Sequence, residues 1–320
     1  MGRSPHVAHA ERVLKAIVSG DAANSALAAS WRRSGHLHAL DPANSAPSLR
    51  FSAAEVAAAR ERLGGLLSVA QSSLDRLVAA VWGVGCSVLL ADNDGVVVER
   101  RGAPCDDATF EGWGLWTGAV WSEKFEGTNG IGTCLFEHRA VTIDRDQHFF
   151  SRNSGLFCTT APIFDEQGQL AAALDVSSCR ADLTEGFARL IGAAVADAAR
   201  LIEAENFRLA YPQARILLAP AREQGGASLL AVDRDDLVIG ATRAARLALG
   251  LSSAALARSM PASDLIGRAK AETDDIEAAE RAVLQRALAR SGGNVSKAAK
   301  GLNLSRATLH RKMNQLGLRI

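Results

Sequence analysis

The first eighty residues place apolar and polar positions at the spacing of an α-helix. Residues 8–18 and 51–81 each gather Ala, Val, Leu or Ile on one face, which predicts two helices. Ser52 followed by Glu55 forms the capping box that opens the second helix. Two prolines and several turn formers occur in segment 34–48, which predicts a loop. The N-terminal region is therefore expected to be helical.

From Gly85 onward the pattern changes to the period of two that is typical of β-strands. Residues 86–101 and 157–178 each hold two β-rich runs around a turn, which predicts two hairpins, and 139–144 predicts a further strand. A long amphipathic helix is predicted over 184–207. Its apolar face is expected to comprise Phe187, Leu190, Ile191, Ala194, Val195, Leu201 and Ile202. Hairpins flanked by long helices indicate an α+β domain with an antiparallel sheet.

A smaller unit and a helical tail complete the chain. Residues 226–251 predict strand, acidic turn, strand and helix, and 256–272 has the composition of a linker. Three helices are predicted in the tail, with capping or turn residues at Asp274, Glu277, Gly292, Gly293, Asn294, Asn303, Ser305 and Gly317. The third helix is expected to pack through Leu304, Leu309, Met313 and Leu316.

Charge is strongly segregated along the sequence. Residues 281–320 contain nine Lys or Arg and no Asp or Glu, whereas the first 280 residues carry 27 Lys or Arg against 35 Asp or Glu. Such segregation indicates that the C-terminal end faces a polyanion. A short helix, a tight turn and a capped helix with a basic outer face form the helix-turn-helix arrangement. Double-stranded DNA is therefore the expected partner of the tail.

Composition and cysteine usage limit the remaining possibilities. A chain of 320 residues predicts two or three domains. The longest run without a charged residue, Leu77 to Ala91, is shorter than the about 20 residues that a membrane-spanning helix needs. The N-terminus lacks the apolar core of a signal peptide, and the five cysteines contain no C-x-x-C pair. We expect a cytoplasmic protein with free thiols and no membrane partner.

Three glycines in the segment 121–139 raise the question of a nucleotide site. Gly127, Gly130 and Gly132 have the reverse of the dinucleotide-binding spacing, and the dipeptide Gly-Lys of a phosphate-binding loop occurs nowhere in the chain. Most glycine clusters are turns, because Gly adopts positive φ without strain. The sequence therefore predicts a shaped loop here, with no nucleotide cofactor and no ATP hydrolysis.

The C-terminal segment resembles a known DNA-binding family. Residues 294–318, NVSKAAKGLNLSRATLHRKMNQLGL, follow the pattern of the Fis-type helix-turn-helix found at the C-terminus of bacterial enhancer-binding regulators. Asn303 departs from the glycine that many relatives carry at the turn. In that family the preceding helix, here Asp275 to Ser291, pairs two subunits, so the resemblance implies a homodimer and an inverted-repeat operator.

The middle of the chain is similar to the GAF sensor domain of acetoin-catabolism-type regulators. The likeness rests on W-S-E…G-T-N-x-I-G-T within 121–133, followed by a C-x-x-A-P-I-x-D-x-x-G hairpin and L-D-V-S. Thr159 and Thr160 depart from the family's pattern. The matching positions are Cys158, Ala161, Pro162, Ile163, Asp165, Gly168, Asp175 and Ser177. The segment SWRRS at 30–34 matches the family's N-terminal entry, and the small strand-turn-strand-helix unit resembles its PAS-like connector.

These resemblances divide the chain into five parts. They are a helical N-terminal region (1–70), a GAF sensor domain (71–207), a PAS-like connector (208–255), a linker (256–272) and a Fis-type helix-turn-helix domain (273–320). Regulators of this family usually carry an AAA+ ATPase between the connector and the tail, where this chain has only about 17 linker residues. We therefore expect a regulator that acts without ATPase activity, with RNA polymerase or a full-length relative as further candidate partners.

Candidate site residues follow from residue type and position. Base-reading and phosphate-positioning residues are predicted at Asn294, Lys297, Lys300, Ser305, Arg306, Thr308, His310, Arg311 and Lys312. Aromatic-rich segments beside a sheet can enclose a small organic effector, which selects Trp113, Trp116, Trp121, His148, Phe149, Phe150 and Cys158. His148 has no second ligand at metal-binding spacing, and no metal site is predicted.

The function expected from the sequence is a ligand-responsive, sequence-specific DNA-binding transcriptional regulator that is not an enzyme. Two alternatives stay open at this point. All five cysteines lie between residues 86 and 179, which allows a thiol redox sensor or a thiol enzyme with a DNA-binding tail. A Fis-type dimer can also act as an architectural protein that bends DNA.

Overall fold

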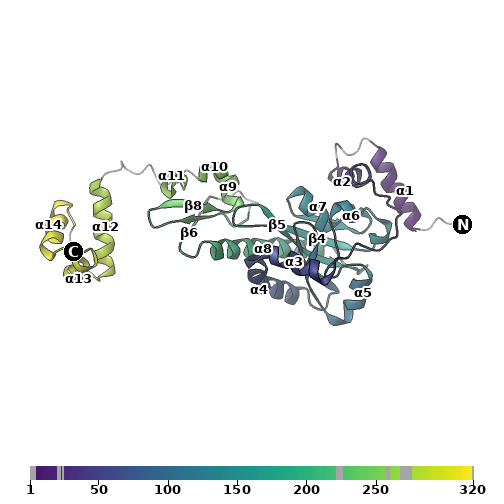
Figure 1. The fold of residues 1–320 in the computed structure, drawn as a ribbon, viewed down its shortest axis with the longest axis horizontal. Coiled ribbons are helices and arrows are strands. Elements are labelled where there is room, and N and C mark those ends of the chain that lie inside the picture. The colour runs from purple at the N-terminus through teal and green to yellow at the C-terminus, as the bar shows by residue number, and fades with distance from the viewer. Residues whose placement is uncertain are drawn as a thin grey trace. The chain divides into compact units, whose positions relative to one another are not determined.

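The computed structural model describes residues 5–19, 23, 25–220, 226–256, 260–266 and 276–318. The chain folds into two compact units, Met1–Met260 and Pro261–Ile320. The first unit contains two β-sheets with their covering helices, and the second ends in a group of three helices (Figure 1). Asp274, the first of the predicted capping residues of the tail, lies outside the described residues.

In the described part of the chain, four α-helices precede the first strand. They are α1 (Pro5–Val18), α2 (Ala26–Arg32), which continues into a π-helical turn at Arg33–Leu37, α3 (Ala53–Leu63) and α4 (Gly65–Ala80). The capping box of Ser52 and Glu55 is present at the start of α3. The single helix predicted over 51–81 is wrong, because Gly64 adopts φ +50° and separates α3 from α4.

The larger sheet has five antiparallel strands in the order β2-β1-β5-β4-β3. Its strands are β1 (Cys86–Asp92), β2 (Val97–Gly102), β3 (Val141–Asp144), β4 (Phe157–Phe164) and β5 (Leu170–Ser178). Successive side chains of β1 point to opposite faces. Val88 and Leu90 belong to the core under α3, α4 and α8 (Glu185–Ala210), whereas Leu89 and Ala91 face Trp121 and the loops beyond it. The sheet is therefore buried on both faces.

The long helix α8 packs beside α4 on one face of this sheet (Figure 1). Ile191, Val195 and Ile202 are buried as predicted. Leu190 and Leu201 are 68% and 47% exposed, so their predicted place on the buried face is wrong. The apolar stripe predicted from the sequence is wider than the contact that the sheet and α4 provide.

Short helices and turns cover the other face of the larger sheet. They are α5 (Asp107–Gly112), α6 (Glu123–Glu126), α7 (Gly130–Glu137) and 3-10 turns at Pro104–Asp106, Arg145–Gln147 and Ser151–Asn153. Helices α1 and α2 contact this region through a separate apolar cluster. The cluster consists of Val13, Ile17, Trp31, Phe149 and Phe150.

The predicted strand-turn-strand-helix unit is part of a smaller sheet. Its antiparallel strands are β6 (Arg215–Leu218), β7 (Leu229–Val232) and β8 (Leu237–Ala241), followed by α9 (Arg243–Leu249) and α10 (Ser253–Leu256). Strand β6 was not predicted from the sequence. Phe207 and Ala204 of α8 pack against Leu229 and Ala231 of β7, so the small sheet completes its core with the end of the long helix.

The C-terminal unit contains α12 (Ile276–Arg290), α13 (Val295–Gly301) and α14 (Arg306–Gln315). Two short elements, β9 (Met260–Pro261) and α11 (Ala262–Leu265), lie within the segment predicted to be a linker. Strand β9 is the fourth strand of the smaller sheet and lies beside β8, so this part of the predicted linker is wrong. Over the described ranges, no helix is both long and apolar enough to span a membrane.

Candidate functional site

Helices α13 and α14 are joined by a tight turn in the C-terminal unit. Asn294 caps α13 by accepting from the Lys297 amide at 3.0 Å, and Ser305 caps α14 by accepting from the Thr308 amide at 3.0 Å. Asn303 adopts φ +51° between the two helices, which Asn tolerates better than most residues. The predicted caps and turn are thus confirmed.

A small apolar core holds the three helices of this unit together. Its buried members are Leu284, Val295, Ala298, Ala299, Leu309, Met313 and Leu316, while Leu304 is half-buried. The arrangement fixes α14 with its N-terminal turn open to solvent, where helix amides and the macrodipole favour an anion. This is the geometry by which a helix end approaches a DNA phosphate or a base edge.

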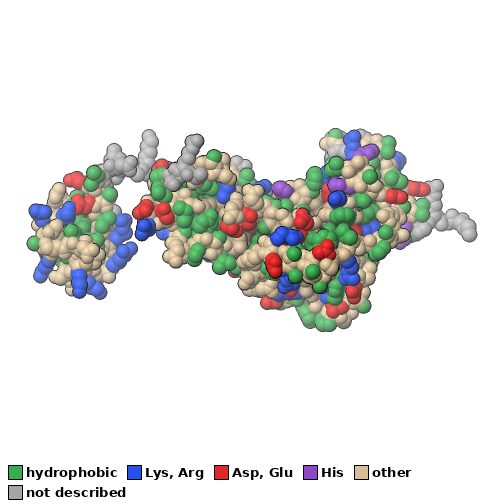
Figure 2. Space-filling model, viewed as in Figure 1, with side chains coloured by type: hydrophobic (Ala, Val, Ile, Leu, Met, Phe, Trp, Pro, Cys, Tyr) green, Lys and Arg blue, Asp and Glu red, His purple; other side chains and the backbone are tan. Residues whose placement is uncertain are grey.

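Basic side chains surround these helices. Lys297, Lys300, Arg306, His310 and Arg311 are all exposed, and Figure 2 shows Lys and Arg gathered around the edge of the C-terminal unit. Among the described residues, Lys297, Lys300, Arg306 and Arg311 form no ion pair with an acid. Their charge is therefore available to a polyanion.

The four other predicted contact residues also have structural roles. Lys312 is half-buried and forms an ion pair with Glu280 of α12. The hydroxyl groups of Thr308 and Ser305 share a hydrogen bond of 2.8 Å. The side-chain oxygen Oδ1 of Asn294 accepts the capping bond from the Lys297 amide. The Lys312 ammonium is therefore less available to phosphate than those of Lys297 and Lys300.

Each glycine of the motif at 127–132 occupies a place where a larger side chain would collide. Gly127 has φ +60° and contacts the Phe149 ring, and Gly132 packs on the backbone of Trp121 and Glu123. A Cβ on Gly130 would lie 2.6 Å from Thr160 Oγ1. The glycines let α7 approach the sheet closely, and this accounts for them without a phosphate.

The carboxylate of Glu123 joins the two N-terminal family motifs. Ser30 Oγ and Thr133 Oγ1 donate to Glu123 Oε1 at 2.7 Å and 2.9 Å. Arg33 donates to both carboxylate oxygens, at 3.0 Å from Nε and 2.9 Å from its terminal nitrogen. Glu123 is only 4% exposed. A buried carboxylate with four donors fixes α2 against α6 and α7.

Sequence reasoning did not identify Glu123, Ser30 or Arg33 as site residues. Their signal was present in the segments SWRRS and W-S-E, which match the family pattern at its N-terminal entry and before the glycines. Nothing in the spacing of 90 residues between Arg33 and Glu123 indicates that they meet. Only the folded chain brings these two segments together.

A second buried polar cluster lies between β4, β5 and His148, which follows the 3-10 turn Arg145–Gln147. His148 Nδ1 is 2.9 Å from the Arg145 carbonyl oxygen, which can only accept, so the proton is assigned to Nδ1. His148 Nε2 is then free to accept from the Cys158 thiol at 3.4 Å. Ser177 Oγ lies 3.1 Å from Cys158 Sγ and donates to Asp175 Oδ2 at 2.6 Å.

Burial determines the protonation of this cluster. Loss of solvation raises the pKa of Asp175 to about 6, against the opposing hydrogen bonds from Ser177 and Thr160. It lowers the pKa of His148 to about 4 and raises that of the Cys158 thiol well above its ordinary value. A neutral imidazole and a protonated thiol therefore lie side by side, and this pair is not a thiolate nucleophile.

The other cysteines show the same trend. Desolvation raises the pKa of Cys86 to about 11 and also raises the pKa values of Cys134 and Cys179. Cys105 is exposed. Four of the five thiols thus lack the electropositive, accessible surroundings that reactive cysteines require.

The predicted effector residues do not form one group. Trp121, His148, Phe149, Phe150 and Cys158 are fully buried, with Trp121 in the sheet core and the two Phe rings against α1 and α2. Trp116 is half-buried with the Arg100 guanidinium 4.5 Å from its ring. Trp113 is half-buried and lines a cavity of about 680 Å³ together with Arg50 and Arg152. Their assignment as effector contacts stays a prediction.

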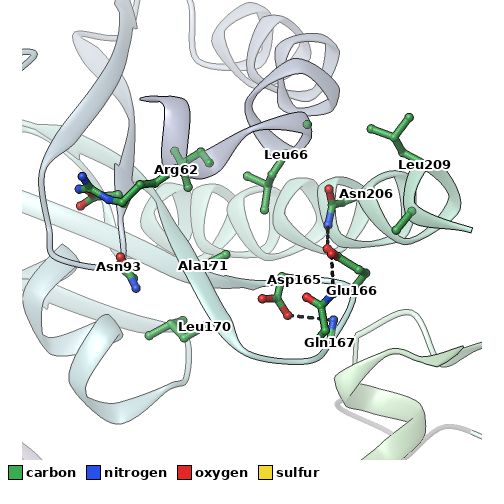
Figure 3. A pocket seen from close by; sticks show the side chains of 14 residues that line it. Arg62, Leu66, Asn93, Asp165, Glu166, Gln167, Leu170, Ala171, Asn206 and Leu209 are labelled. Carbon is green, nitrogen blue, oxygen red and sulfur yellow. Dashed lines mark hydrogen bonds and ion pairs between the residues drawn. The ribbon is translucent and has the colours of Figure 1, made fainter. Parts of the chain in front are cut away.

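Another cavity, of about 520 Å³, lies between α4, the turns of the two hairpins and the end of α8. Figure 3 shows the apolar side chains of Leu66, Leu170 and Ala171 and the polar side chains of Asp165, Glu166 and Asn206 around it, with Asn206 close to Glu166. Asn206 donates to Glu166 at 2.9 Å, and Asp165 accepts from its own turn. The polar groups of this cavity are thus largely engaged with one another.

Two family models match the chain. The description "MimR, N-terminal domain" matches residues 7–198, and "Bacterial regulatory protein, Fis family" matches residues 275–316. The first match covers more than half of the chain. The second covers α12, α13 and α14 together.

Curated relatives carry similar descriptions. The chain is 34% identical over 224 residues to the acetoin catabolism regulatory protein of Cupriavidus necator, covering 69% of this chain and 34% of the relative. It is 34% identical over 111 residues to the acetoin dehydrogenase operon transcriptional activator AcoR of Bacillus subtilis, covering 35% and 18%. It is 28% identical over 162 residues to the propane 2-monooxygenase operon transcriptional activator MimR of Mycolicibacterium smegmatis, covering 50% and 26%. The chain spans about a third or less of the length of these relatives.

A solved structure has a similar fold. The E. coli DhaR(N)–DhaL complex matches with a TM-score of 0.52 at 17% identity, covering 82% of this chain and 85% of the matched chain. Identity this low supports the fold only. The mixed α/β architecture with an antiparallel sheet is therefore shared with the matched chain of that complex.

Proposed function

The chain belongs to the family of acetoin-catabolism-type regulators that the MimR N-terminal domain defines, and on this premise we propose that it is an effector-responsive, sequence-specific DNA-binding regulator of transcription. One observation carries the proposal: a family-type N-terminal region and a Fis-type helix-turn-helix occur on the same chain. The exposed basic N-terminal turn of α14 supplies the means of contacting DNA.

Base reading is assigned to Arg306, Thr308, His310 and Arg311 on α14. Phosphate positioning is assigned to Lys297 and Lys300, with smaller contributions from Lys312, Ser305 and Asn294. Arginine can bind a guanine edge bidentately, whereas lysine acts as a point charge on phosphate. A regulator that binds promoter DNA is expected to act in the cytoplasm.

Two copies of the chain are proposed to pair through α12. Ile276 and Val283 lie seven residues apart on this helix and are 84% and 42% exposed, while Leu284 packs inward. Apolar residues at heptad spacing on a solvent-facing helix side are typical of a helix–helix seam. A two-fold dimer would present two α14 helices to an inverted-repeat operator.

The effector is proposed to bind in the GAF-like domain that contains the larger sheet. Among the seven aromatic, His and Cys candidates, Trp113 lines a cavity, whereas Trp121, His148, Phe149, Phe150 and Cys158 are buried. We infer no enzyme activity, because the raised pKa values of Cys86, Cys134, Cys158 and Cys179 disfavour thiolate chemistry.

ATP hydrolysis is likewise not expected. The glycines at 127–132 pack against protein groups, and the segment between α11 and α12 is too short for an ATPase domain. Promoter action would then depend on recruitment or repression, with RNA polymerase or a full-length relative as the partner. Purified protein should hydrolyse ATP no faster than a blank without protein.

Selection from a random duplex library tests the DNA-binding proposal. The full chain should enrich an inverted repeat with half-sites about one helical turn apart. A variant with Arg306→Ala and Arg311→Ala should enrich no motif while retaining its fold by circular dichroism. Enrichment of bent but unrelated sequences would contradict the proposal and favour an architectural role.

A further inference from the structure

Helix α14 ends in a glycine turn that satisfies part of its last carbonyl groups. The Leu318 amide donates to the Met313 carbonyl oxygen at 2.8 Å, and the Gly317 amide donates to that of Asn314 at 3.3 Å. Gly317 adopts φ +66°, so this pair of bonds is a Schellman motif. Within the described residues, no backbone amide donates to the Leu316 carbonyl oxygen. This last carbonyl group needs a donor from elsewhere.

Arg281 of α12 supplies that donor. Its Nε donates to the Leu316 carbonyl oxygen at 3.0 Å, and a terminal guanidinium nitrogen donates to the same atom. Because 35 positions separate the two residues, this bond is a tertiary link and not a local cap. A cation at this place also meets the negative end of the helix macrodipole. Arg281 therefore closes the C-terminal end of α14 from another helix.

The residue beside Arg281 makes a second polar link between the two helices. Glu280 forms an ion pair with Lys312 in the last turn of α14, and each of these side chains is 30% exposed. Leu284 of α12 belongs to the same buried apolar cluster as Leu309 of α14. Two adjacent residues of α12 thus hold the last turn of α14, one through its backbone and one through a side chain.

The opposite end of α14 carries the side chains that are proposed to read bases. The helix has 10 residues and is about 15 Å long at about 1.5 Å per residue. A tilt of about 10° around the end held by α12 would therefore move the N-terminal turn by about 2.5 Å. A hydrogen bond to a base edge forms only within about 2.7–3.2 Å, whereas the attraction of a point charge to phosphate falls off gradually with distance. Loss of the links to α12 is consequently expected to weaken base reading more than phosphate binding.

We propose that Glu280 and Arg281 are positioning residues that determine how well the protein distinguishes its operator from other DNA. Arg281 holds the orientation of α14, so that Arg306 reaches a base edge. Glu280 pairs with the Lys312 ammonium and thereby withholds one cation from the phosphates of any sequence. This inference rests on the proposed function, because it assigns to α12 a share in the specificity of α14.

A direct phosphate contact is the alternative role for Arg281, and a matched control separates the two. Arg286 also lies on α12, is exposed, and forms no hydrogen bond or ion pair within the described part of the chain. Arg281→Met removes the charge and the donors but keeps a long, helix-forming side chain, and Arg286→Met removes a charge alone. Arg281→Lys keeps the charge and a donor.

The full chain and its variants are titrated with the duplex that the wild type enriches from a random library and with a scrambled duplex. We expect Arg281→Met to weaken binding of the enriched duplex about tenfold more than Arg286→Met, because it loses a hydrogen bond from a charged donor. Both variants should bind the scrambled duplex equally. Arg281→Lys should recover most of the preference for the enriched duplex. Circular dichroism verifies that the helix content is unchanged.

Glu280→Gln tests the second link and leaves the bond to the Leu316 carbonyl oxygen in place. The freed Lys312 ammonium should strengthen binding of the scrambled duplex and steepen its salt slope by about one unit. The enriched duplex should gain less, because α14 has lost one of its two polar links to α12. The ratio of the two affinities should therefore fall.

Three outcomes would overturn the inference. The first is an equal preference for the enriched duplex in Arg281→Met and Arg286→Met. The second is a loss on both duplexes in Arg281→Met with a salt slope about one unit below that of Arg286→Met, which would make Arg281 a phosphate contact. The third is an equal gain on both duplexes in Glu280→Gln, and this result decides alone if Arg281→Met loses its helices. A wild type that enriches no motif contradicts the proposed function itself, and this is seen before any variant is made.

Discussion

At the scale of single residues, Gly130 determines how closely α7 approaches the sheet. It lies over Thr160, Cys158 and Asp175, and a Cβ there would be 2.6 Å from Thr160 Oγ1 and 2.7 Å from Cys158 Cβ. All three neighbours belong to central strands and are fully buried, so they have little room to move. A methyl group at this position must therefore displace the helix or the cluster.

Gly130→Ala should lower the free energy of unfolding by about 1–3 kcal/mol, because overpacking forces such shifts. Gly186→Ala is the matched control, since Gly186 lies in the first turn of α8 and a Cβ there meets nothing within 4 Å. That control should be neutral or stabilising by about 0.5–1 kcal/mol. Urea unfolding of both variants measures the difference, and equal midpoints would contradict the close approach.

The pKa values of Asp175 and His148 predict opposite pH dependences. The folded-state pKa of Asp175, about 6, exceeds the ordinary 3.8, so its contribution to stability is greatest below about pH 4 and is lost as pH rises to about 6. The folded-state pKa of His148, about 4, lies below the ordinary 6.5, so its contribution is lost as pH falls through that range. The two effects oppose each other in the wild type.

Asp175→Asn should remove one of these effects. Relative to the wild type, the variant should gain up to about 3 kcal/mol of unfolding free energy between about pH 4 and about pH 6, since about two pKa units are abolished. Urea titrations at several pH values measure the difference between the two proteins. A constant difference across this range would mean that Asp175 is ionised in the folded protein with an ordinary pKa.

At the scale of elements, local signals predicted the helices and hairpins, and tertiary contacts decided the exceptions. The helix caps at Ser52, Asn294 and Ser305 are formed by hydrogen bonds within one turn. Because both partners of such a bond are close in the sequence, the caps could be predicted from the sequence alone. The break at Gly64 was missed because a Gly-Gly pair is also compatible with a continuous helix. Strand β6 was missed because its partner β7 lies beyond a connection that carries no strand pattern.

The candidate site was less predictable than the fold. A motif match marked Ser30 and Arg33, but the ion pair with Glu123 spans 90 residues and exists only after folding. Aromatic composition selected Phe149 and Phe150, which proved to be packed against Trp31 and α1. Composition alone does not separate a ring that lines a cavity from a ring that fills a core.

Helix α12 exposes Val283 on the surface through which two copies of the chain are proposed to pair. Val283→Asp places a charge on the proposed seam and should convert the dimer to a monomer at micromolar concentration, because an unpaired charge opposes apolar burial. Ala54→Asp on exposed α3 is the control and should leave the dimer intact. Sedimentation equilibrium distinguishes the two states. If Val283→Asp remains dimeric, the pairing surface lies elsewhere.

At the scale of the whole molecule, function depends on a division of charge. The acids among the described residues of the C-terminal unit are Asp264 of α11 and Glu277 and Glu280 of α12, and none follows Glu280, whereas the first 280 residues carry an excess of acids. Non-specific DNA should therefore contact the C-terminal unit and be released steeply by salt. Specific DNA requires the base-reading side chains of α14 in addition.

Salt titration of variants on cognate and scrambled duplexes separates these two roles. Lys297→Ala should weaken both duplexes equally and reduce the salt slope by about one unit, because its exposed ammonium contacts phosphate. Lys312→Ala should change the slope by less, since that ammonium is paired with Glu280. Arg306→Ala should cost about 1–3 kcal/mol on the cognate duplex alone, if its guanidinium binds a guanine bidentately. Equal losses on both duplexes would make Arg306 a backbone contact and assign specificity to His310, Arg311 or DNA shape.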